Sequence, residues 1–236
     1  MSMKKQRQTN LLIRSSLAVA LSLVISAPLQ AQSGSSSKGK KAVEGKLMKI
    51  PAALPVIGEL GENIYDLAKV DDWTKAADRL TSLREAVQEL SVEAASAHVD
   101  KERLNQRIEG LGKAIPAKDR HAAMREANQV TLIAANLTAP FDPKVPVDVT
   151  RLDYYGRELE IWSTANDKDK LKATASDTRK TWDRLRPSVV THNGAAEARE
   201  FDELLARVEA AKSPKEYSLV ATPLLDAVDK LEKLYK

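Results

Sequence analysis

The most regular feature of the chain is a recurrence of apolar residues at spacings of three and four, which predicts amphipathic helices from about residue 57 to the end. No segment behind the N-terminal region shows the period of two that is typical of half-buried strands. We therefore expect an all-α fold of about eight helices. The first apolar residues of the eight predicted stripes are Ile57, Ala76, Leu104, Ala123, Val149, Leu171, Ala198 and Tyr217.

Some helix boundaries carry their own signals. The second stripe runs from residue 76 to residue 97 without a break, which predicts one long helix capped by Asp71 or Asp72. The third helix is expected to follow a cap at Asp100. The last helix should begin at Ser213-Pro214-Lys215-Glu216, a capping box with proline at the first helical position.

A proline-rich connector at residues 139–147 divides the predicted helices into two sets of four. Helices joined by short loops alternate in direction, so we expect two tandem up-and-down four-helix bundles, at residues 53–138 and 148–236. The alternative is one continuous bundle. The apolar positions of residues 104–137 mostly coincide with those of residues 201–234, which suggests an internal repeat although identities are few.

The N-terminus has the order of an export signal. Basic residues precede an apolar run at residues 17–27, and a small residue at Ala31 offers a cleavage site. The run is shorter than the roughly 18 to 20 residues that span a bilayer, so residues 1–31 are interpreted as a cleaved signal peptide rather than an uncleaved anchor. We expect a periplasmic or secreted protein. Residues 32–52 are read as a flexible basic leader, suited to weak contact with an anionic membrane surface.

Charge argues against nucleic acid as a partner. The chain has 37 basic and 33 acidic residues, but four of the basic ones and none of the acidic ones lie in the predicted signal peptide. The remainder therefore carries 33 of each sign. The basic pI of the whole chain therefore reflects the targeting segment and not a nucleic-acid interface.

The sequence contains few of the residues and motifs that are typical of enzymes. The chain has no cysteine, which excludes disulfides, thiolate metal sites and covalent haem attachment. The zinc motif H-E-x-x-H, the nucleophile elbow G-x-S-x-G and the phosphate loops are absent as well. Neighbouring carboxylates do occur, but Asp153, Arg157 and Glu160 are interpreted as a surface ion-pair ladder. We expect no enzyme, no catalytic residue and no bound cofactor.

Two residue sets are candidate sites. His121 and Met124 are three apart on the fourth predicted helix, where they could supply a soft nitrogen and sulfur site for copper or an axial haem ligand. Phe141, Tyr154 and Trp162 crowd the connector and the fifth helix, and would form a partner-binding surface if they are exposed. The competing interpretation places Trp162 in the core.

These observations favour an exported, non-enzymatic helical-bundle protein that acts through contacts with an exported or membrane-associated protein. The alternative is a haem-binding or copper-type metal-binding periplasmic four-helix bundle. A hydrolase that works through paired carboxylates is a third hypothesis.

Overall fold

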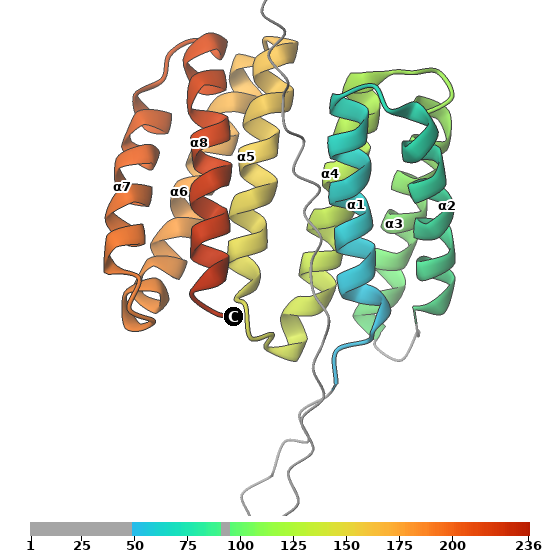
Figure 1. Ribbon diagram of the computed structural model, residues 1–236, viewed down its shortest axis with the longest axis horizontal. Helices are drawn as coiled ribbons and strands as arrows, with labels where there is room; N and C mark the ends of the chain where they lie inside the picture. Colours follow the sequence, from blue (N-terminus) through green and yellow to red (C-terminus); the bar gives the residue numbers. More distant parts are fainter. Residues whose placement is uncertain (1–48, 91–94) are drawn as a thin grey trace, which may run out of the picture. The chain divides into compact units, whose positions relative to one another are not determined.

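The computed structural model describes residues 49–90 and 95–236, and this part of the chain holds eight α-helices and one 3₁₀ helix but no strand (Figure 1). The expected all-α class is confirmed. The predicted signal peptide and most of the predicted leader lie outside the described residues. The elements are α1 (Ala53–Lys69), α2 (Trp73–Glu89), α3 (Ala95–Ala114), α4 (Arg120–Thr138), η1 (Ala139–Phe141), α5 (Val147–Ala165), α6 (Lys168–Thr191), α7 (Ala195–Ala210) and α8 (Pro214–Lys233).

Side-chain caps begin several helices where the sequence predicts them. The Asp72 carboxylate accepts a hydrogen bond from the backbone N–H of Lys75, and the Ser213 hydroxyl accepts one from the N–H of Glu216. The Glu216 carboxylate reaches back to the N–H of Lys212 at 2.7 Å, which completes a reciprocal cap one residue earlier than in the standard box. Each cap satisfies a backbone donor that the helix itself leaves unpaired.

The predicted boundary between the second and third helices is wrong. Helix α2 ends at Glu89, and Leu90 has an extended backbone, with φ −64° and ψ 112°. Helix α3 already begins at Ala95, so Asp100 lies inside a helix rather than at its start. Apolar periodicity missed this break because the stripe resumes in register after it.

The helices form two sets of four, and each set has its own apolar core. Helix α1 packs against α2 and α4, and α3 packs against α4, while α5 packs against α6 and α8, and α7 against α6 and α8 (Figure 1). The described residues nevertheless belong to one compact unit, because α4 also packs against α5. Ile161 of α5 belongs to the core of the first set, and Trp162 contacts both cores.

The proline-rich connector is short and partly ordered by η1. Asp142 ends this 3₁₀ helix in the left-handed region, with φ 48°. Phe141 is half-buried against the core of the first set. None of the described helices combines the length and the apolar composition that a membrane span requires.

The contact between α1 and α4 depends on a glycine. A Cβ atom added at Gly61 would lie 2.8 Å from the Thr131 hydroxyl oxygen and 3.1 Å from the carbonyl oxygen of Ala127. Thr131 is fully buried and the Ala127 carbonyl is backbone, so neither can move aside cheaply. The absence of a side chain at Gly61 therefore sets how closely the two helices approach.

We expect Gly61→Ala to lower the free energy of unfolding by about 1–3 kcal/mol, because the overpacked contact outweighs the better helix propensity of alanine. Gly112→Ala is the matched control, since its added Cβ would meet only the tip of the Arg84 side chain. Urea denaturation followed by circular dichroism measures both. A Gly61→Ala protein as stable as the Gly112→Ala protein would contradict the close approach of α1 and α4.

Candidate functional site

Helix α5 carries charged side chains in the interior of the described unit. Arg157 and Glu158 are each 6% exposed, because α4, α6 and α8 pack against α5 and side chains of α1 reach it as well. The interpretation of Arg157 as part of a surface ladder is therefore wrong. We call the following group the α5 polar layer: Glu62, Tyr65, Asn128, Asp153, Tyr154, Arg157, Glu158 and Glu160.

Arg157 is the centre of one half of this layer. Its guanidinium lies 3.2 Å from the Asp153 carboxylate on the same helix and 3.7 Å from the Glu62 carboxylate on α1. It also stacks over the Tyr65 ring, 5.2 Å from the ring centroid. The buried charge is thus neutralised by two carboxylates and an aromatic face, and it ties α1 to α5.

Glu160 extends the connection between helices. The Tyr65 hydroxyl donates a hydrogen bond to its carboxylate at 2.8 Å, and the Lys69 ammonium pairs with it at 2.7 Å. The Thr222 hydroxyl of α8 donates to the same carboxylate at 3.4 Å. Burial, reinforced by the Glu160 charge, raises the pKa of Tyr65, so this phenol stays protonated and remains a donor.

Glu158 organises the side of the layer that faces α4. Its carboxylate accepts hydrogen bonds from the Trp162 indole N–H and from the side-chain amide of Asn128, the latter at 3.1 Å. Asn128 also donates to the backbone carbonyl of Tyr154 at 3.1 Å, and Gln129 donates to the Tyr154 hydroxyl at 2.6 Å. Burial raises the pKa of Glu158, while these donors act in the opposite direction by stabilising its charge.

Glu62 is a carboxyl group of this layer whose pKa lies near neutrality. Burial raises its pKa to about 7, and Arg157 opposes the increase. The carboxylates of Asp153, Asp66 and Glu232 favour the protonated form as well. Carboxyl groups from α1 and α5 thus act on one guanidinium, and charging Glu62 adds a negative group to a region that already holds several.

The aromatic residues predicted to form a partner surface do not lie on one exposed patch. Tyr154 is 7% exposed and is held at the contact with α4, and Trp162 is half-buried between the two cores. Phe141 is half-buried against the first core, from the connector. The interpretation of Trp162 as a core residue fits its position better.

The predicted metal ligands lie on α4, near Trp162. The His121 ring packs edge-on against the Trp162 indole, with centroids 5.8 Å apart, and its buried Nε2 has no hydrogen-bond partner among the described residues. Met124 is buried in the first core. The described part of the chain contains no group of three or more His, Cys, Asp or Glu side chains arranged to hold a metal ion.

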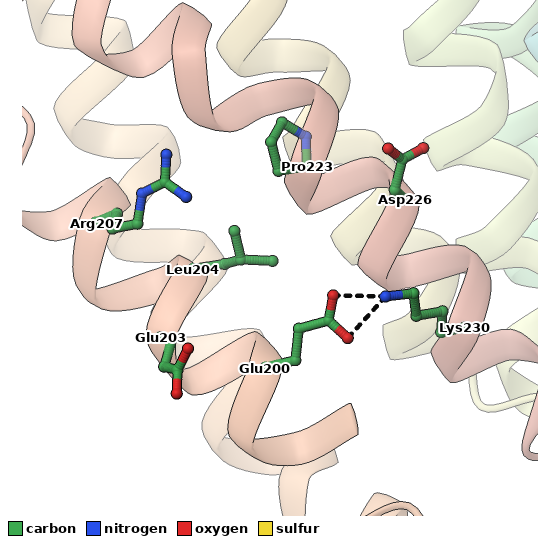
Figure 2. A pocket seen from close by; sticks show the side chains of 7 residues that line it. All are labelled: Glu200, Glu203, Leu204, Arg207, Pro223, Asp226 and Lys230. Carbon is green, nitrogen blue, oxygen red and sulfur yellow. Dashed lines mark hydrogen bonds and ion pairs between the residues drawn. The ribbon is translucent and has the colours of Figure 1, made fainter. Parts of the chain in front are cut away.

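A second polar feature is a groove on the surface between α7 and α8, with a volume of about 300 Å³ (Figure 2). Leu204 projects between the two helices, and Lys230 pairs with the Glu200 carboxylate at 2.6 Å. We call it the α7–α8 groove, and its lining residues are Glu200, Glu203, Leu204, Arg207, Pro223, Asp226 and Lys230.

Sequence reasoning missed both the polar layer and the groove. The available signal for the layer was that α5 carries apolar residues around its whole circumference, including Leu152, Tyr154, Leu159 and Ile161. A helix that is apolar on all sides is covered on all sides, so its charged residues are buried too. The signal for the groove was Pro223 inside the eighth stripe.

We expect the stability difference between Glu62→Gln and the wild type to depend on pH. The raised pKa means that the stabilising contribution of protonated Glu62 is complete below about 4.5 and is lost as the pH rises to about 7. Glu62→Gln should match the wild type near pH 4.5 and be more stable at pH 8. Because the Glu62 side chain is 40% exposed, we expect a gain of only about 1 kcal/mol.

Urea denaturation at both pH values measures this gain, with Glu59→Gln as the control on an exposed position of the same helix. The control should follow the wild type at every pH. A constant offset between Glu62→Gln and the wild type would show that Glu62 does not titrate in this range.

Removing the Arg157 guanidinium should lower the free energy of unfolding by about 3–5 kcal/mol, because Arg157→Ala leaves the partly buried Asp153 and Glu62 carboxylates without their counter-charge and empties a buried site. Arg199→Ala, at an exposed position of α7, should change stability by no more than about 0.5 kcal/mol. Chemical denaturation of the two variants measures the difference. A loss below about 1 kcal/mol at Arg157 would mean that the α1–α5 contact does not need this charge.

Comparison with known proteins gives no indication of function. The chain matches no family model, no curated protein and no solved structure. What the protein does must therefore be inferred from its own residues, above all the buried polar layer and the exposed groove.

Proposed function

We propose that this chain is an exported, non-enzymatic protein that acts by binding another exported or membrane-associated polypeptide. One observation carries the proposal: the buried ionisable groups of the α5 polar layer pair with one another across helix contacts. A group that performs chemistry on a substrate must reach a cavity, whereas these groups hold helices together. The charged groups of the interior thus stabilise the fold, and we place the binding function on the surface.

The surface offers apolar side chains that a partner could cover. Large apolar residues are exposed on three helices or at their ends, and Leu219 of α8, at 62% exposed, is the most open of them. Single exposed apolar residues are common in soluble proteins, so such a residue supports partner binding only where it lies near the α7–α8 groove, as Leu219 does. The exposed set is Val56, Val70, Val190 and Leu219.

The exported part of the proposal rests on the order of residues 1–31 and on the absence of cysteine. Cell fractionation with N-terminal sequencing of the mature chain tests it. We expect the protein outside the cytoplasm with its first residue near Gln32. A cytoplasmic protein that retains residues 1–31 would contradict export.

One observation favours a second function, the binding of a soft metal ion or haem through His121 and Met124. The buried Nε2 of His121 has no hydrogen-bond partner among the described residues, so it is a free acceptor for a ligand. Elemental analysis and the absorption spectrum of protein purified from its own host test this function. Stoichiometric metal that is lost in His121→Ala would favour it over partner binding.

Photo-crosslinking in cells tests partner binding directly. A benzoylphenylalanine introduced at each exposed apolar position should give a discrete crosslinked species at one or more of them, identified by mass spectrometry. The same group at Glu85, an exposed position of α2, is the control and should give none. Recovery of the uncrosslinked chain alone at every apolar position would contradict the proposed function.

A further inference from the structure

We propose that the α7–α8 groove binds a basic amphipathic helix. The inference rests on the proposed function, since this helix would belong to the polypeptide partner. It adds the site at which the partner binds and the chemistry that the site recognises. A groove between two neighbouring helices is a common receptor for a third, which lays its apolar stripe along the floor.

The floor and one end of the groove are apolar. Leu204 of α7 is buried and points into the space between the helices, and Pro223 lies across from it on α8 (Figure 2). Leu219, one turn before Pro223, extends this apolar line onto the open surface. A volume of about 300 Å³ is at the lower limit for a small-molecule site, and it suits a few apolar side chains of a helix.

The charged side chains that line the groove favour a partner of positive charge. Glu200 and Lys230 neutralise each other across the groove, with both carboxylate oxygens within 2.8 Å of the ammonium. Glu203 on α7 and Asp226 on α8 form no ion pair with other described residues, and both are exposed. Arg207 is the one unpaired cation of the lining within the described chain. Two open carboxylates against one guanidinium favour a ligand with lysine or arginine on both flanks of its apolar stripe.

Pro223 contributes a further acceptor. Proline has no backbone N–H, so the carbonyl of Leu219, four residues earlier, lacks the donor that an α-helix ordinarily provides. Leu219 lies two turns before Asp226 on the same helix. A lysine or arginine of the ligand can donate to the carbonyl oxygen as well as to the carboxylate, which again favours a basic helix.

Three synthetic 16-residue peptides test the inference with the whole mature protein. The first is alanine-based, with leucine at helical spacings of three and four and two lysines on each flank of the stripe. The second has glutamate in place of every lysine, and the third keeps the composition of the first in scrambled order. Fluorescence anisotropy measures binding at low and moderate salt. We expect the basic peptide to bind more tightly than either of the others and to weaken with added salt.

The variant Glu203→Lys/Asp226→Lys reverses the two open charges at exposed positions, so the fold should be retained, and circular dichroism checks this. Each exposed ion pair changes affinity by about two- to fivefold, so we expect the double variant to bind the basic peptide about 4- to 25-fold more weakly. It should also gain affinity for the acidic peptide. Glu85→Lys, on α2, is the matched control and should bind like the wild type.

Several outcomes would overturn the inference. These are equal binding of the basic and scrambled peptides, no effect of the double charge reversal, or an equal effect of Glu85→Lys. Association of the protein with itself through the groove, seen as a Leu219→Asp-sensitive dimer in analytical ultracentrifugation, would replace the partner helix by a second copy. Binding to anionic vesicles that the double charge reversal leaves unchanged would place membrane contact elsewhere.

The peptide experiment and the cellular experiment fail separately. Peptide binding that follows the charge reversal, in a protein that crosslinks to nothing in cells, would support the groove and contradict the proposed function. Crosslinks in cells from Val56 or Val70 alone, with no peptide binding, would support the function and overturn the groove.

Discussion

The structure of the described unit depends on the burial of one guanidinium. Arg157 is removed from water by helices on both sides of α5, and its charge is compensated by Asp153 from its own helix and Glu62 from α1. A buried charge tolerates few alternative arrangements, and a shift of α1 along α5 would take the Glu62 carboxylate and the Tyr65 ring away from Arg157, leaving it only the Asp153 carboxylate of its own helix. An apolar contact of equal area would permit such shifts. The ion pairs therefore fix the register of the first helix set against α5.

This constraint makes α5 a shared element of two cores. Its apolar residues divide between them: Leu152 and Leu159 lie in the second core, Ile161 lies in the first, and Trp162 contacts both. The Glu158 carboxylate holds the Trp162 indole at that junction and also accepts from Asn128 on α4. Hydrogen bonds are directional, so polar groups at the junction specify orientation where apolar packing alone specifies only contact.

The sequence predicts the local part of this architecture well and the non-local part poorly. Periodicity and caps such as Asp72 and Ser213 identify helices, because a helix and its first turn are determined by residues a few positions apart. The same periodicity extended the second helix to residue 97, since a stripe that resumes in register hides the end of α2 at Glu89. Arg157 was taken for a surface residue for a different reason: its burial depends on α1, which lies about 90 residues earlier in the chain. Burial by a helix so distant in the sequence cannot be predicted from the spacing of neighbouring residues.

Because the charged groups of the interior are paired with one another, charged groups that are free to bind a ligand lie on the surface. The charges along α5 are committed to one another, and moving them costs the pairing of several buried groups at once. On the outer edge of the second set, in contrast, Glu203 and Asp226 stand exposed on opposite walls of a groove floored by Leu204. A basic ligand that lies in the groove can pair with both of these carboxylates. The α7–α8 groove is thus the place where an approaching polypeptide can satisfy charges that the fold itself leaves open.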